Sequence, residues 1–241
     1  MEIDKYILGL CKRALLSSNE SGKYSASLKN KVLKSISNYI IDDTKKIISA
    51  NNVDIDNALK KGLKDSMIDR LVLNEKRIAS MKDGLAKIIS IPDTLYKTSR
   101  GIKQKNGISV SQMRVPLGVI GMIYESRPNV TIDAAGLCIK SGNSVILRGG
   151  SESINSNKVL MNCIKKALKD HNINPYMVQL IETTDRRAID KLLAMNSYID
   201  VIIPRGGNGL IEKVMSSSKI PMIKHLDGNC HVYIDQKADL E

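Results

Sequence analysis

The sequence predicts an α/β fold in which helices flank a parallel β-sheet. After residue 118, short apolar segments of strand length alternate with longer helical segments. This alternation is typical of right-handed β-α-β units. The 241 residues are 42% hydrophobic but include no Phe and no Trp. The core must therefore be built from branched aliphatic side chains and Met, which suit buried parallel strands.

Residues 1 to about 90 are predicted to be helical. Apolar residues recur there at helical spacing, for example Leu28, Val32, Leu33, Ile36 and Ile40. Asn74 is the expected N-cap of a further amphipathic helix.

A β-hairpin is predicted over residues 99–115. Two extended segments, 99–104 and 108–115, flank Lys105, Asn106 and Gly107. Asn-Gly is the strongest short hairpin signal, so we expect a protruding two-stranded arm.

The parallel sheet is expected to follow the hairpin. The predicted strands span residues 119–124, 144–147, 177–181, 201–203, 222–225 and 231–235. The predicted helices span residues 129–140, 152–169, 186–195 and 209–217. The sequence ends at Glu241, a few residues after the last predicted strand. We therefore expect this end to fall within a domain.

Composition favours a reduced, cytoplasmic protein without metal. The formal net charge is +12, but the lysines are scattered and aromatic stacking residues are few, which argues against a nucleic-acid partner. The N-terminus has no apolar signal core and no segment is long enough for a membrane span. The four cysteines show neither CxxC nor metal-ligand spacing.

Three predicted strands end in polar, glycine-containing segments that each hold an arginine. These segments are 125–129, 148–152 and 204–209, with Arg127, Arg148 and Arg205. Each precedes a helix, whose free amides and dipole attract anions. Together they predict a phosphate-bearing ligand at the carboxyl edge of the sheet. Alone, residues 149–151 could be a tight turn with an N-cap, and residues 206–209, which fail the GxGxxG spacing, could be a plain loop.

Two blocks of sequence carry a family resemblance. Residues 114–153 read RVPLGVIGMIYESRPNVTIDAAGLCIKSGNSVILRGGSES, and residues 200–235 read DVIIPRGGNGLIEKVMSSSKIPMIKHLDGNCHVYID. Both blocks, about a third of the chain, resemble the γ-glutamyl phosphate reductase family of the aldehyde dehydrogenase superfamily. The resemblance implies an aldehyde dehydrogenase-like fold with N-terminal helices, a Rossmann-like cofactor-binding domain over residues 1–230 and an oligomerisation arm at the hairpin. Residues 231–241 would then be the first strand of a truncated catalytic domain, in a homo-oligomer.

The same resemblance implies NADPH as cofactor. The strand end at Arg148 corresponds to the place where the family binds the adenosine ribose, and an arginine beside glycines suits a 2′-phosphate. The implied cofactor-binding residues are Arg148, Gly149, Gly150, Ser151, Arg205, Gly206, Gly207 and Gly209.

The implied reaction is reduction of γ-glutamyl 5-phosphate, a small acyl phosphate, to glutamate-5-semialdehyde and phosphate in proline biosynthesis. Arg127 and Asn129 are the expected substrate-binding residues, clamping the acyl phosphate or the developing oxyanion. The alternative for Arg127 is a salt bridge to Glu125 or an interface contact. Glutamate 5-kinase, which makes the acyl phosphate, is an expected partner.

The family nucleophile is a cysteine that we expect beyond Glu241, so this chain is expected to be inactive by itself. Cys138 and Cys163 fall on apolar helix faces, Cys11 lies in the first helix, and Cys230 begins the last predicted strand. His225 occupies the region where hydrolytic relatives carry a water-activating Glu, although a structural role for it is favoured. The alternative function is a non-catalytic nucleotide-binding or assembly module.

Overall fold

A four-stranded parallel sheet lies at the centre of the computed structural model, which describes residues 2–224, 231 and 233–239. The strands follow the order β5-β4-β3-β6. The chain runs outward from β3 through β4 to β5 and then returns to pair β6 with the other side of β3. The order therefore reverses between β3 and β6, and such a reversal opens a crevice at the carboxyl ends of the strands. The strands are β3 (Val119–Tyr124), β4 (Ser144–Arg148), β5 (Val178–Leu180) and β6 (Val201–Arg205).

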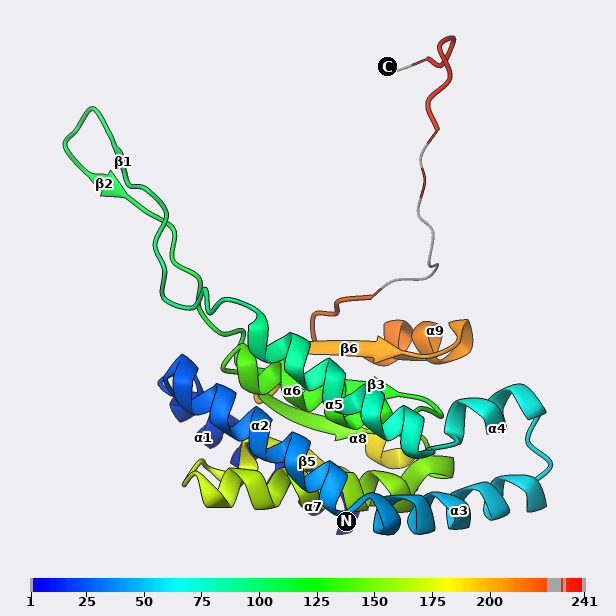
Figure 1. Ribbon diagram of the computed structural model, residues 1–241. Helices are drawn as coiled ribbons and strands as arrows, with labels where there is room; N and C mark the ends of the chain where they lie inside the picture. The colour runs from blue at the N-terminus through cyan, green and yellow to red at the C-terminus, as the bar shows by residue number, and fades with distance from the viewer. Residues whose placement is uncertain (1, 225–230, 232, 240–241) are drawn as a thin grey trace.

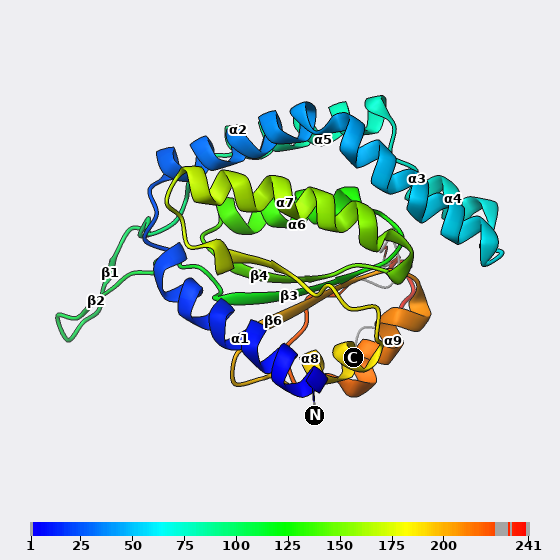
Figure 2. The ribbon, with the colours of Figure 1, turned by 90° about the horizontal axis from the view of Figure 1, so that it is seen from below.

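Helices cover both faces of this sheet (Figure 2). On one face lie α6 and α7, and α2, α3 and α5 form a further layer outside them; on the other face lie α1, α8 and α9. The helices are α1 (Glu2–Ser21), α2 (Ala26–Asp42), α3 (Thr44–Lys60), α4 (Asp65–Leu71), α5 (Glu75–Ser90), α6 (Asn129–Lys140), α7 (Ile154–Asp170), α8 (Arg187–Leu193) and α9 (Asn208–Ser217), with 3₁₀ turns η1 (Ser151–Ser153) and η2 (Pro175–Met177).

The alternation of side chains along β3 explains the two cores. Ile120, Met122 and Tyr124 join the cluster under α6 and α7, whereas Val119 and Ile123 join the cluster under α1, α8 and α9. Both faces of the strand are buried, as expected for a parallel sheet covered on both sides.

Most element boundaries agree with the sequence-based predictions. The predicted bounds of β3 and α6 are confirmed, and Asn74 caps α5 by accepting a hydrogen bond from the Arg77 amide at 2.9 Å. The prediction for α8 was too long, because its helix covers only Arg187–Leu193.

The predictions near the end of the chain differ more. The strand predicted at 222–225 is reduced to one bridge between Ile202 and Met222, and His225 lies outside the described residues. The described part of the strand predicted at 231–235 forms no strand. A strand needs a neighbour to satisfy its backbone groups, and Tyr233 and Ile234 are 85% and 62% exposed.

A hairpin lies within the predicted residues 99–115 and extends away from the helices (Figure 1), but its strands are much shorter than predicted. Its strands are β1 (Ile102–Lys103) and β2 (Ser109–Val110), with a further bridge between Thr98 and Met113. Gly107 has a φ of 89°, a left-handed conformation that glycine adopts without strain.

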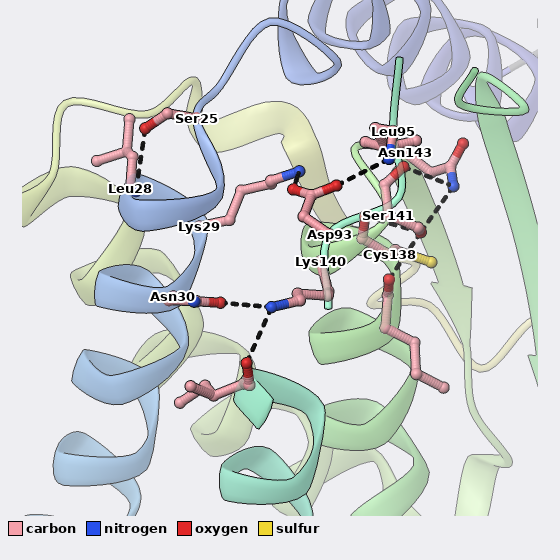
Figure 3. A network of polar contacts seen from close by, with 12 residues as sticks. Ser25, Leu28, Lys29, Asn30, Asp93, Leu95, Cys138, Lys140, Ser141 and Asn143 are labelled. Atoms are coloured by element: carbon pink, nitrogen blue, oxygen red, sulfur yellow. Dashed lines mark hydrogen bonds and ion pairs between the residues drawn. The ribbon is translucent and has the colours of Figure 1, made fainter. Parts of the chain in front are cut away.

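A buried ionic cluster anchors the segment that leads into the hairpin (Figure 3). Lys29 of α2 forms a 2.6 Å ion pair with Asp93, and Asp93 also accepts a hydrogen bond from the Leu95 amide at 3.0 Å. Beside them, Lys140 of α6 donates to Asn30 Oδ1 at 2.7 Å and to the Ile89 carbonyl at 3.0 Å. These contacts tie the root of the arm to two helices.

Within the described residues, no helix is long and apolar enough to cross a membrane.

Candidate functional site

A side-chain hydrogen bond joins the loops that follow β3 and β6. β3 delivers Glu125, whereas β6 leads through Gly206 to Gly207, the N-cap of α9. The Gly207 amide donates to Glu125 Oε2 at 2.9 Å. A Cβ atom on Gly206 would lie only 2.6 Å from the Glu125 carboxyl carbon, so glycine permits this approach. An anion-attracting helix N-terminus therefore holds a carboxylate of the chain itself.

Arg148 ends β4, but its side chain is less open than the sequence predicted. It is only 5% exposed, and its Nη1 donates to the Gly149 carbonyl. Its Nε has no hydrogen-bond partner among the described residues. Burial lowers the pKa of Arg148, while the nearby negative charge of Glu152 opposes that shift. A buried guanidinium with an unused donor is costly and favours an anionic ligand at this place.

Glu152 connects the loops that follow β3 and β4. Its Oε1 accepts hydrogen bonds from the Ser126 amide at 2.8 Å and from Ser126 Oγ at 2.7 Å. Ser126 has a φ of 42°, uncommon for a residue with a side chain. The sequence placed Glu152 in the right loop, but no local signal predicted its contact with a residue 26 positions earlier.

A chain of buried polar groups supports the loop after β4. Tyr124 Oη and Thr131 Oγ1 are 2.7 Å apart, Thr131 donates to Asn157 Oδ1 at 2.9 Å, and Asn157 Nδ2 donates to Ser153 Oγ at 3.0 Å. A Cβ atom on Gly149 would collide with Asn157. Packing thus requires a glycine at position 149, in addition to its place in the loop. This packing requirement was not predicted from the sequence.

Ser151 and Gly150 lie at the surface side of this loop. Ser151 is exposed, and its Oγ lies 3.5 Å from Glu152 Oε2. Gly150 is the N-cap of η1, and a Cβ atom there would collide with the Glu152 carboxylate. The Glu152 carboxylate therefore occupies space beside both predicted cofactor residues.

Arg127 and Asn129 line a separate pocket of about 340 Å³ at the start of α6. Asn129 Nδ2 donates to Asp133 Oδ2 at 3.0 Å. Arg127 is exposed, and its side chain makes no hydrogen bond or ion pair with the described part of the chain. The alternative of a salt bridge from Arg127 to Glu125 is therefore not formed, because Glu125 turns to Gly207 instead.

The three strand-end arginines lie in different surroundings. Arg148 is buried below the loop after β4, whereas Arg205 is exposed and its charge acts on Asp133. Burial raises the pKa of Asp133, and the Asn129 hydrogen bond and Arg205 oppose that rise. The arrangement separates a buried cation under β4 from a mixed-charge pocket beside α6. Gly209 lies in the first turn of α9 with open space around it.

The described cysteines are core residues. Cys11, Cys138 and Cys163 are buried, and burial raises the pKa of their thiols to about 12, 12 and 11. The core interpretation of Cys138 and Cys163 is confirmed. Cys230 lies outside the described residues. In the described ranges, no group of three or more His, Cys, Asp or Glu side chains could hold a metal ion.

Counted along the chain, the strands of the sheet lie in the order 3-2-1-4, which together with the glycine-containing strand ends defines a Rossmann-like α/β protein. The chain belongs to the aldehyde dehydrogenase family, whose model matches residues 10–241.

Comparison with individual proteins supports the assignment of the chain to this family. A γ-glutamyl phosphate reductase from Halothermothrix orenii is 47% identical over 241 residues, which are all of this chain and 58% of that protein. The crystal structure of γ-glutamyl phosphate reductase from Thermotoga maritima matches with a TM-score of 0.90 and 37% identity, over 97% of this chain and 56% of that one. The crystal structure of γ-glutamyl phosphate reductase from Saccharomyces cerevisiae matches with a TM-score of 0.84 and 32% identity, over 96% of this chain and 59% of that one. The chain thus spans less than two thirds of the length of these relatives.

Proposed function

We propose that this chain provides the cofactor-binding part of an enzyme that uses NADPH to reduce γ-glutamyl 5-phosphate to glutamate-5-semialdehyde and phosphate, a step of proline biosynthesis. The reaction is supported by the names of relatives that are 46–47% identical over the whole chain. The cofactor is supported by one observation above all, the buried Arg148 with its unpartnered Nε at the end of β4. Residues 1–230 would form this part, and residues 231–241 would lead into the catalytic domain.

The residues at the strand ends fit the phosphates of NADPH. The proposal assigns the 2′-phosphate to Arg148, the Gly149 and Gly150 loop and Ser151, because a guanidinium pairs well with phosphate oxygens. It assigns the pyrophosphate to the amides of Gly206, Gly207 and Gly209, with Arg205 nearby, because amides at a helix N-terminus bind anions. The Gly207 amide, which donates to Glu125 here, would exchange that carboxylate for the phosphate. When bound, NADPH supplies a hydride.

The remaining residues in the proposal act on the substrate. Arg127 and Asn129 bind it from the pocket beside α6. A thiolate must displace phosphate to form a thioester. Cys11, Cys138 and Cys163 are unsuited to this because burial raises their pKa values far above neutrality. The proposed nucleophile is therefore a cysteine outside this set.

The proposed partners are a second copy of the chain, through the hairpin, and glutamate 5-kinase. The hairpin carries exposed apolar side chains at Ile102, Ile108 and Val110. A two-stranded hairpin is marginally stable by itself, which favours covering it in an oligomer. A nearby kinase would deliver an acyl phosphate before water hydrolyses it.

The experiment is titration of NADPH and NADH against the unmutated chain and Arg148→Met. Methionine retains apolar volume in the buried site but removes the charge. A charge-assisted hydrogen bond contributes about 1.5–3 kcal/mol, so NADPH should bind roughly tenfold to a hundredfold more tightly than NADH. Arg148→Met should remove most of this preference, whereas Arg100→Met in the exposed hairpin segment should retain it. Equal affinities for both cofactors in the unmutated chain would refute the assignment.

A further inference from the structure

We infer that the pocket beside α6 recognises the α-amino acid end of the substrate, with Arg127 and Arg70 facing its α-carboxylate and Asp133 facing its α-ammonium group. This inference rests on the proposed function and deepens it, since it assigns the end of the substrate that does not react. It places Arg127 at the α-carboxylate, in place of the acyl phosphate that the sequence led us to expect. The pocket is formed by α4, the start of α5 and the start of α6.

The positive charge in this pocket comes from two arginines. Arg70 and Arg127 both line it and both are exposed, and the guanidinium group of neither forms a hydrogen bond or ion pair with other described residues. Arg77 also lines it, but its guanidinium is occupied by the Val72 carbonyl at 2.8 Å and by Asp69 Oδ1 at 2.8 Å. Arg77 therefore holds the wall of the pocket in place, and Arg70 and Arg127 provide the donors for a ligand.

Two carboxylates line the pocket, and because Asp69 is paired with the Arg77 guanidinium at 2.8 Å, Asp133 provides the negative charge for a ligand. Its carboxylate is partly buried, and in the described structure its one hydrogen bond comes from Asn129 Nδ2 at 3.0 Å. An ionised carboxylate can accept about four hydrogen bonds. Burial raises the pKa of Asp133, because the ionised carboxylate has lost part of its hydration. An ammonium group of a ligand would compensate for that lost hydration. Asn129 thus positions Asp133.

This combination distinguishes an amino acid from a phosphate. A phosphate alone would be repelled by Asp133, whereas an α-amino acid presents a carboxylate and an ammonium group one carbon apart. A guanidinium pairs with a carboxylate through two parallel hydrogen bonds. The volume of about 340 Å³ is in the range of small-ligand sites.

The location agrees with a substrate that extends toward the crevice. Arg127 follows β3 by three residues, after Glu125 and Ser126, which bridge to the loops of β6 and β4. The pocket therefore lies next to the carboxyl end of β3, where the proposed reaction would take place.

The test is calorimetric titration of the unmutated chain with L-glutamate, glutarate and 4-aminobutyrate. Glutarate lacks the ammonium group, and 4-aminobutyrate lacks the α-carboxylate. We expect L-glutamate to bind about tenfold or more tightly than either, because each analogue loses a charge-assisted contact. Absence of L-glutamate binding, or equal affinity for L-glutamate and glutarate, would overturn the inference without relying on any variant.

Variants then assign the two ends. Asp133→Asn should weaken L-glutamate binding about tenfold and should not weaken glutarate binding, because the lost negative charge only repels a dicarboxylate. Arg127→Gln should weaken the binding of L-glutamate and glutarate and spare that of 4-aminobutyrate. The controls Asp190→Asn on α8 and Arg100→Gln near the hairpin should alter none of these affinities. Equal weakening of all three ligands by Asp133→Asn would contradict the assigned role.

NADPH binding measured in the same samples separates the two hypotheses. Bound NADPH without selectivity for L-glutamate would overturn this inference alone. Selective L-glutamate binding without NADPH binding would instead overturn the proposed cofactor assignment and support the pocket.

Discussion

Glu125 and Gly207 meet across the point where the strand order reverses, with the Gly207 amide donating to Glu125 Oε2 at 2.9 Å. The Glu125 carboxylate lies against Gly206. The proposed function places the cofactor phosphates at this same position. Glu125 is therefore expected to move away when NADPH binds, and its negative charge is expected to oppose binding.

Replacing Glu125 by Gln tests this competition. The amide retains the shape of the side chain but removes the charge from the N-terminus of α9. Anions at helix N-termini gain about 0.3–1 kcal/mol, so the variant should bind NADPH roughly twofold to fivefold more tightly. The measurement is quenching or enhancement of NADPH fluorescence on titration. Glu212→Gln, an exposed position on α9, controls for the change in net charge; equal effects of both substitutions would contradict a local role for Glu125.

Asp93→Asn tests the buried cluster at the root of the hairpin. The Lys29 side chain is 1% exposed and would lose its carboxylate partner. An uncompensated buried charge costs about 3–5 kcal/mol, so the free energy of unfolding should fall by that order. Urea unfolding followed by circular dichroism measures it. Asp190→Asn, which removes an exposed ion pair to Lys213, should change stability by about 1 kcal/mol or less.

The same aspartate makes a pH-dependent contribution to stability. Burial by itself would raise the pKa of Asp93, but the Lys29 hydrogen bond, the Leu95 amide and the charges of Lys29 and Lys140 together lower it. A carboxyl whose pKa is lowered on folding stabilises the protein above its unfolded pKa of about 3.9 and loses that contribution as the pH falls through its folded pKa. The difference in stability between the unmutated chain and Asp93→Asn should therefore shrink below about pH 4. A difference that stays constant to pH 2 would show that the charge of Asp93 is not involved.

The hairpin is expected to drive self-association. Ile102, Ile108 and Val110 are 68%, 58% and 51% exposed. If the chain self-associates as proposed, replacing residues 101–114 by a short Gly-Ser linker should yield monomer in sedimentation velocity, because it removes this apolar surface. An unchanged sedimentation coefficient distribution, after correction for mass, would show that the arm has another role.

The buried thiols are expected to react slowly with a disulfide reagent. With pKa values raised to about 12, 12 and 11, Cys11, Cys138 and Cys163 hold almost no thiolate at pH 8. Labelling of the folded chain should be slow at all three positions, whereas all four cysteines should react in denaturant. Peptide mass analysis of the labelled positions provides the measurement. Fast labelling of Cys11 or Cys138 in the folded chain would contradict their assignment to the core.

The candidate site was predictable in outline but not in its contacts. The periodicity of apolar residues identifies the strands, and the segments that contain arginine and glycine come directly after them. The position of these segments at the carboxyl edge of the sheet could therefore be predicted from the sequence. The burial of Arg148 could not be predicted, because the depth and direction of a long side chain depend on what packs around it. Arg148 is 5% exposed beneath its own loop, whereas Arg127 and Arg205 are exposed.

The amino-acid sequence by itself determined the elements whose signals are local. The bounds of β3 and α6 follow from an apolar run, a helical period and the left-handed Gly142 after the helix, with a φ of 70°. Only the tertiary structure decided that Ser126 binds Glu152 and that Gly207 binds Glu125, pairs that are 26 and 82 residues apart. The physical reason is that these contacts depend on strand order, which brings distant loops to one edge of the sheet and leaves no periodic trace in the sequence.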